Sequence, residues 1–199
     1  HPHNRVSSVQ RKLMTTGKDK NVFNIAVNGN FDDCQNLVKT MFADKNFSND
    51  IKMSGVNSIN WARIIAQSVY YFYSYFLIDD NNRPINFSVP TGNFGDVYAG
   101  YLAKKMGLPI NKLIVATNQN DILHRAISNG SYEVENVFET LSPSMDIQVA
   151  SNFERLLYDL NEGDDLQTID AMKNIKEKGK YIINQEKLDK INTNFLSSR

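Results

Sequence analysis

A strand-like apolar run that leads through a two-glycine loop into a helix constrains this chain more than any other feature. The run covers residues 86–89, Pro90 ends it, and loop 91–96 places Gly92 and Gly95 before a helical pattern over 97–106. This order of elements presents bare backbone N–H groups to an anion, because glycines allow close approach and the first helical turn has unpaired donors. Asp96 is the only charged residue of the loop. A phosphate bound here would therefore be held mainly by amides.

The rest of the chain alternates between strand-like and helical patterns. We expect helices at 32–43, 59–77, 95–106 and 121–128, and strands at 22–27, 86–89 and 112–116. Strands separated by helices form parallel βαβ units. The sequence therefore predicts an α/β fold with a parallel sheet flanked by helices.

Length and composition exclude several classes of protein. The 199 residues suffice for one large domain or two small ones, and the 22 basic and 22 acidic residues cancel. No overall field therefore favours nucleic acid or an anionic membrane. The single cysteine, Cys34, excludes an internal disulfide framework and a cysteine-based zinc cluster. The apolar stretch 69–78 is too short to span a bilayer. We expect a cytoplasmic protein without a metal site.

A second group of polar residues precedes and enters the expected helix 59–77. Asn57 or Ser58 is a plausible N-cap for this helix, while Asn60, Arg63 and Gln67 fall on one face of it. Polar side chains on a largely apolar helix must find partners. This stripe either lines a polar ligand site or forms the solvated side of the helix. We favour the ligand site for Asn57, Ser58 and Asn60, and less so for Gln67.

Taken alone, the glycine loop leaves two interpretations open, an ordinary strand-to-helix turn and a phosphate site. Neither the dinucleotide pattern of spaced glycines nor the P-loop pattern with its lysine is present. The sequence therefore argues against a dinucleotide-binding fold and against a P-loop nucleotide hydrolase.

Together, these segments resemble threonine synthases of the kind found in fungi and many bacteria. The resemblance runs in the order of that family over about residues 4–160, through the segments 5–10, 14–16, 29–35, 56–63, 89–96, 99–109, 116–121, 141–146 and 151–155. It implies the fold-type II pyridoxal-phosphate architecture, like that of the tryptophan synthase β subunit, in an incomplete form. It also implies conversion of O-phospho-L-homoserine and water to L-threonine and phosphate, a step of threonine biosynthesis.

Carried over to this chain, the resemblance assigns two sets of site residues. The cradle for the phosphate of pyridoxal 5'-phosphate would comprise Gly92, Asn93, Phe94, Gly95 and Asp96. The substrate O-phospho-L-homoserine would contact Asn57, Ser58, Asn60 and Arg63.

The chain departs from the family at the catalytic lysine. In the family, the lysine that forms a Schiff base with the cofactor lies in an upstream segment with a Phe-Lys-Asp core, and that segment does not occur here. The distal segment that supplies a partner for the pyridine nitrogen is also missing. A lysine is needed to hold the cofactor and to move protons at the substrate carbons. We expect these 199 residues to be a fragment that is inactive alone and completed by the remainder of the same polypeptide.

Two alternatives stay open. One is another fold-type II pyridoxal-phosphate lyase, such as a phospho-lyase or a dehydratase. The other is a non-catalytic domain that keeps the phosphate loop to bind a ligand. For the domains, we expect residues 1–45 in a smaller α/β domain, 46–160 in the cofactor-phosphate domain, and 161–199 as a peripheral, polar, helical segment.

Overall fold

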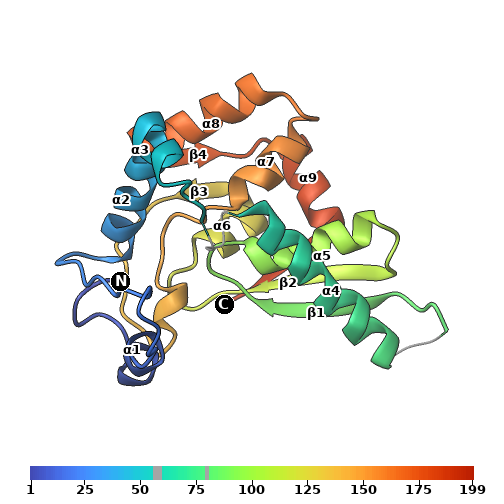
Figure 1. The fold of residues 1–199 in the computed structure, drawn as a ribbon. Coiled ribbons are helices and arrows are strands. Elements are labelled where there is room, and N and C mark those ends of the chain that lie inside the picture. The colour runs from blue at the N-terminus through green and yellow to red at the C-terminus, as the bar shows by residue number, and fades with distance from the viewer. Residues whose placement is uncertain (56–59, 79–80) are drawn as a thin grey trace. The chain divides into compact units, whose positions relative to one another are not determined.

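The computed structural model describes residues 1–55, 60–78 and 81–199, and of Phe31 and Asp32 only the backbone. The chain forms two compact units, His1–Gly55 and Val56–Arg199 (Figure 1). Among the described helices, none combines the length and the apolar character that crossing a membrane requires. The assignment of residues 1–45, 46–160 and 161–199 to separate domains stays a prediction.

The first unit contains three helices, α1 (Ser8–Thr15), α2 (Phe31–Ala43) and α3 (Lys45–Asp50). Helix α2 begins with a capping box: the side chain of Asn30 accepts from the Asp33 amide, and the Asp33 carboxylate accepts from the Asn30 amide. Each bond satisfies a backbone or side-chain group at the helix start that would otherwise lack a partner. The local sequence thus fixes where this helix begins.

The predicted strand at 22–27 is wrong. In this segment only Val27 forms a β-bridge, with Pro2, and the side chains of Phe23 and Ile25 are 83% and 73% exposed. Alternating apolar residues form a strand when a neighbouring strand pairs with them and a core covers one face. Within the described part of this unit, the segment has neither.

The second unit is built on a three-stranded parallel sheet. Its strands are β1 (Ile85–Pro90), β2 (Ile110–Ala116) and β5 (Phe195–Ser198), in the order β1-β2-β5. Strand β2 is central: Val89 pairs with Val115 on one side, and Leu113 pairs with Phe195 on the other. The α/β class with a parallel sheet is confirmed.

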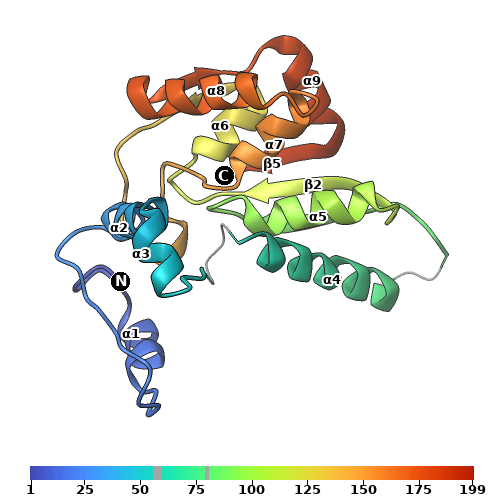
Figure 2. The same cartoon turned by 45° about the horizontal axis from the view of Figure 1, so that its top comes forward.

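Helices and short elements complete this unit. They are α4 (Trp61–Ile78), α5 (Gly95–Lys105), α6 (Ile122–Asn129), β3 (Ser131–Glu133), the 3-10 turn η1 (Pro143–Met145), α7 (Phe153–Leu160), α8 (Asp165–Lys178), β4 (Lys180–Ile182) and α9 (Gln185–Asn194). Figure 2 shows α5 lying along β2, with α4 beside α5. The four helices predicted from the sequence are present as α2, α4, α5 and α6.

The sheet is buried on one face only. Val89, Leu113 and Val115 point into the core and are at most 5% exposed, whereas Asn86 and Ser88 alternate with them and are exposed. Successive side chains of a strand point to opposite faces, so this pattern places the packing helices on a single side. Helices therefore cover one face of the three-stranded sheet.

The C-terminal segment contributes buried residues to the second unit. Residues 195–198 form β5 beside β2, and the ring of Phe195 is fully buried against Phe94 and Tyr101. Helix α9 also buries Ile191. The polar composition of 161–199 describes the outer helix faces, while a few apolar residues complete the core.

Candidate functional site

The glycine loop begins at the carboxyl edge of the parallel sheet. Pro90 ends β1 and pairs with Ala116, the last residue of β2, and the Thr91 amide then donates to the Ala116 carbonyl at 2.8 Å. The Thr91 hydroxyl donates to the Val89 carbonyl at 2.6 Å, and Thr91 itself is buried. In open α/β sheets, ligands bind at this edge. Thr91 thus anchors the start of the loop where a ligand site is expected.

A residue in the left-handed conformation turns the loop into helix α5. Phe94 is the N-cap of α5 with φ 64° and ψ 4°, and no side chain caps the helix. This conformation is uncommon for a residue with a Cβ and costs of order 1 kcal/mol. The Phe94 ring is fully buried, 5.4 Å from the Phe153 ring and 5.6 Å from the Phe195 ring. This packing offsets the backbone cost and holds the loop in place.

Four successive amides of this loop, at 92–95, find no acceptor in the part of the chain that the structure describes. Among the hydrogen bonds of the described residues, none is donated by the backbone N–H of Gly92, Asn93, Phe94 or Gly95. Phe94 and Gly95 are buried, and unpaired buried N–H groups are costly. Their position at the first turn of α5 adds the positive end of the helix dipole. The donor set is the one that suits a phosphate group, so the loop fits the predicted cradle.

A neighbouring loop packs directly on Gly92. A Cβ added there would lie 3.1 Å from the Cα of Met145 and 3.4 Å from the carbonyl oxygen of Ser144. Both atoms belong to the backbone of η1 and are not free to rotate away. The close approach of η1 therefore favours glycine at 92.

Asp146 holds the end of this neighbouring loop. Its Oδ1 accepts from the Asn118 side-chain amide at 2.8 Å, from the Asn120 side-chain amide at 3.1 Å and from the Thr140 hydroxyl at 2.7 Å. Its Oδ2 accepts from the Thr140 amide at 2.8 Å. One carboxylate thus joins the segment after β2 to the segment that contacts Gly92.

The side chain of Asp96 faces α4 within the same unit. Its Oδ1 accepts from the hydroxyl of Tyr71 at 3.3 Å, and its carbonyl accepts from the same hydroxyl at 2.9 Å. Desolvation raises the pKa of Asp96, and the Tyr71 hydrogen bond opposes this in part. Desolvation and the neighbouring Asp96 charge raise the pKa of Tyr71 far above its ordinary value, so its hydroxyl stays a donor. Asp96 joins the first turn of α5 to α4.

The predicted substrate residues are only partly described. Asn57 and Ser58 lie outside the described residues. The side chain of Asn60 accepts from the Ala62 amide at 2.9 Å, and its carbonyl accepts from the Arg63 amide at 3.1 Å. Asn60 therefore caps the start of helix α4, and Arg63 lies exposed in the first turn. Their role as substrate ligands stays a prediction.

Sequence reasoning assigned no role to two residues that shape the loop. Asn152 contacts the Asn93 carbonyl with two hydrogen bonds, and Asp146 is the central acceptor described above. In the sequence, Asn152 stands before a helical pattern and reads as an ordinary N-cap. The structure shows no cap bond from its side chain, which is turned to the loop instead.

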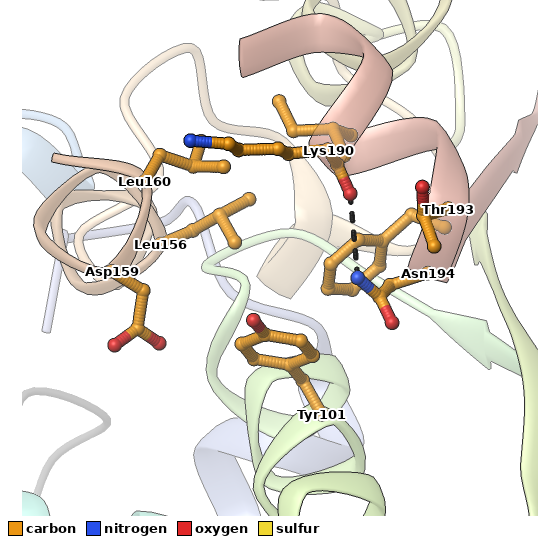
Figure 3. A pocket seen from close by; sticks show the side chains of 9 residues that line it. Tyr101, Leu156, Asp159, Leu160, Lys190, Thr193 and Asn194 are labelled. Carbon is orange, nitrogen blue, oxygen red and sulfur yellow. Dashed lines mark hydrogen bonds between the residues drawn. The ribbon is translucent and has the colours of Figure 1, made fainter. Parts of the chain in front are cut away.

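A cavity of about 240 Å³ lies among α5, α7 and α9, near the beginning of β5 (Figure 3). Tyr101, Asp159 and Lys190 line it. The Lys190 ammonium pairs with Glu162 at 3.1 Å and Glu186 at 3.0 Å, and these bonds raise its pKa. A lysine that attacks a carbonyl must be neutral, so this one is poorly suited to bind a cofactor covalently.

Metal ligands do not gather in the part of the chain that the structure describes. No group of three or more His, Cys, Asp or Glu residues there is arranged to hold a metal ion.

Comparisons with known proteins give the family. No family model matches the chain. It is 53% identical over 187 residues to the threonine synthase of Pseudomonas aeruginosa, covering 94% of this chain and 40% of that protein. The threonine synthase of Saccharomyces cerevisiae is 46% identical over 211 residues, covering 100% of this chain and 41% of its own length.

Solved structures agree with the sequence comparison. The crystal structure of a PLP-bound threonine synthase from Brucella melitensis matches with a TM-score of 0.88 at 50% identity, covering 100% of this chain and 43% of that one. Threonine synthase from yeast matches with a TM-score of 0.84 at 46% identity, covering 100% and 41%. The chain spans about two fifths of the length of these relatives. Over the length that it matches, the chain belongs to the threonine synthase family.

Proposed function

We propose that this chain is part of a pyridoxal-phosphate-dependent threonine synthase that converts O-phospho-L-homoserine and water to L-threonine and phosphate. One observation carries the proposal: at the start of α5, four successive backbone amides at 92–95 have no acceptor among the described residues, in a chain that is 53% identical to a threonine synthase. The chain would supply the phosphate cradle and part of the substrate site. The complete enzyme would act on this small molecule in the cytoplasm.

The loop would bind the phosphate of the cofactor through its backbone. The amides of Gly92, Asn93, Phe94 and Gly95 are available as donors, and the Asp96 amide follows in the first turn of α5. Amides bind a dianion without bringing a compensating charge, so the phosphate keeps its charge and gains from the helix dipole. These residues would thereby fix the position of the cofactor relative to the sheet edge.

Bound in this cradle, pyridoxal phosphate supplies an electron sink for carbanion chemistry at the substrate. The side chains of Asn57, Ser58, Asn60 and Arg63 would orient the substrate. Amide, hydroxyl and guanidinium groups are donors to carboxylate and phosphate oxygens, both of which O-phospho-L-homoserine carries. The lysine that moves the substrate proton would come from the remainder of the polypeptide.

The test uses a protein that contains this chain and has the full length of a threonine synthase. We expect it to bind pyridoxal 5'-phosphate much more tightly than pyridoxal, and to release phosphate and threonine from O-phospho-L-homoserine. Failure to bind the cofactor would overturn the proposal. Binding with turnover of another amino-acid substrate would instead identify a different lyase of the same fold type.

A second experiment tests the expected division of labour. The 199-residue chain alone should show no turnover. Borohydride reduction in the presence of pyridoxal phosphate, followed by peptide mapping, should modify no single lysine selectively. Selective modification of one lysine of this chain would show that the covalent partner lies within it.

A further inference from the structure

Asn152 holds the peptide in the middle of the glycine loop. Its backbone amide donates to the Asn93 carbonyl at 3.1 Å, and its side-chain amide donates to the same oxygen at 3.2 Å. Asn152 is fully buried, with 0% of its surface exposed. A buried polar side chain that makes its bonds to one backbone oxygen fixes the direction of that oxygen.

The direction of the Asn93 carbonyl determines the direction of the next amide. The peptide bond is planar and trans, so the Asn93 C=O and the Phe94 N–H point to opposite sides. With the carbonyl bound to Asn152, the Phe94 N–H points away from α7. This N–H is one of the amides without a protein acceptor among the described residues.

Arg155 orients the Asn152 side chain. The Arg155 Nε donates to Asn152 Oδ1 at 3.0 Å, and the guanidinium lies 5.0 Å from the centre of the Trp61 ring. Guanidinium has donors only, so the Asn152 oxygen must face Arg155 and its NH₂ must face the Asn93 carbonyl. The hydrogen bond from Arg155 thereby sets the orientation of the Asn152 side-chain amide.

The loop needs such a restraint. Phe94, the residue that follows the bound carbonyl, has φ 64°. A backbone conformation of this kind persists where the surroundings impose it. Ring packing holds the side chain of Phe94, while Asn152 holds the peptide before it.

We propose that Asn152 is a positioning residue that points the Phe94 amide at the bound anion. In this role Asn152 acts through the Asn93–Phe94 peptide, whose carbonyl it binds. The inference rests on the proposed function, in which the anion is the phosphate of pyridoxal phosphate.

The test compares Asn152→Asp with Asn161→Asp. Both substitutions are made in a protein that contains this chain and has the full length of a threonine synthase. Asn161 makes the same kind of buried bond at the other end of α7, where its side-chain amide donates to the Thr168 hydroxyl at 2.9 Å. Both variants exchange an NH₂ donor for an oxygen in a buried site. Only Asn152→Asp places that oxygen against the Asn93 carbonyl and repels the peptide.

The readout is the ratio of the dissociation constants of pyridoxal and pyridoxal 5'-phosphate, measured below the unfolding temperature of each variant. This ratio isolates binding of the phosphate from binding of the ring. We expect Asn152→Asp to lower the ratio about tenfold or more, since one charge-assisted hydrogen bond is lost. Asn161→Asp should leave it unchanged. The phosphorus resonance of the bound cofactor should move only in the Asn152 variant.

An unchanged ratio in a folded Asn152→Asp protein would overturn the inference and leave the proposed function standing. Should that variant fail to fold, Asn152→Ser decides, because it keeps the backbone bond to the Asn93 carbonyl and removes the side-chain amide that donates to the same oxygen. An unchanged ratio in Asn152→Ser would then overturn the inference. If the wild-type protein binds pyridoxal and its phosphate equally, the cradle itself is wrong and the proposed function fails.

Discussion

The backbone of Met145 lies where a side chain at Gly92 would begin: a Cβ on Gly92 would lie 3.1 Å from the Met145 Cα. This close approach joins the glycine loop to η1, whose position depends on the Asp146 carboxylate. The shape of the cradle is thus determined by its own glycines and by a loop some fifty residues further along the chain.

Replacing Gly92 with alanine should impair the cradle. The methyl group forces η1 and the loop apart by a few tenths of an ångström, which costs about 1–3 kcal/mol of stability. It should also weaken binding of pyridoxal phosphate more than binding of pyridoxal. Titration with both compounds and denaturant unfolding measure the two effects. Gly17→Ala is the control, because a Cβ at Gly17 meets no atom within 4 Å. Equal cofactor affinity in both variants would contradict the prediction.

Gly100 allows helices α4 and α5 to approach each other closely. A Cβ there would lie 2.5 Å from a ring carbon of Tyr71 and 2.8 Å from Leu113 Cδ2. Alanine favours a helix over glycine by about 1 kcal/mol, but overpacking at this site costs about 1–3 kcal/mol. We therefore expect Gly100→Ala to lower the free energy of unfolding in urea. A stabilised variant would show that α4 moves away without cost.

Removing the charge of Asp146 should loosen the neighbouring loop. In Asp146→Asn an NH₂ group must face either the Thr140 amide or the donors gathered at Oδ1. A donor against a donor leaves a half-buried group unpaired, at a cost of about 2 kcal/mol.

Glu139→Gln is the matched control for this change, because Glu139 is exposed beside the same loop. Thermal unfolding and proteolysis within 140–146 measure the effect. Equal stability of the two variants would mean that the loop does not depend on the Asp146 carboxylate.

The half-buried carboxyl of Asp96 gives stability a pH dependence. Desolvation raises its pKa in the folded protein above the ordinary 3.8, so the folded state binds the proton more tightly than the unfolded state does. The contribution is greatest below the unfolded pKa and is lost as the pH rises through the folded pKa. Asp96→Asn keeps an acceptor for the Tyr71 hydroxyl and removes the titration.

The melting temperature of Asp96→Asn relative to the wild type should therefore rise as the pH increases from 3.5 toward neutrality. Thermal unfolding over this range measures the difference. A difference that stays constant with pH, or that falls, would contradict a raised pKa.

Local sequence patterns predicted much of the fold correctly. The run before Pro90, the loop with Gly92 and the helical pattern after it predicted β1, the loop and α5, because each depends on neighbours in sequence. The strand expected at 22–27 failed for the opposite reason. Its apolar alternation is present, but strand formation depends on a partner that the sequence pattern does not specify.

Strand β5 was missed because its signal is weak. Residues 195–198 contain only Phe195 and Leu196 as apolar side chains, and their pairing with β2 is non-local. A stretch this short is recognised as a strand only once its neighbour in the sheet is known.

The glycine loop was visible in the sequence, but the side chains that shape it were not. Asn152 binds the Asn93 carbonyl across 59 residues, and Asp146 receives the Asn118 amide across 28. A polar side chain in a turn and one before a helix both have ordinary local explanations. Their hydrogen bonds to groups far away in the sequence become apparent only in the three-dimensional structure.

The central place of β2 has a consequence for the order in which this unit assembles. Strand β1, helix α5 and β2 are consecutive, so they can meet early, whereas β2 reaches β5 only by closing a long loop: the Lys112 ammonium donates to the Thr193 carbonyl 81 residues away. Phe195 belongs to β5, and the centre of its ring lies 5.6 Å from that of Phe94. We therefore expect the anion-binding loop to acquire its final shape late in folding, when the chain's C-terminal strand docks beside β2.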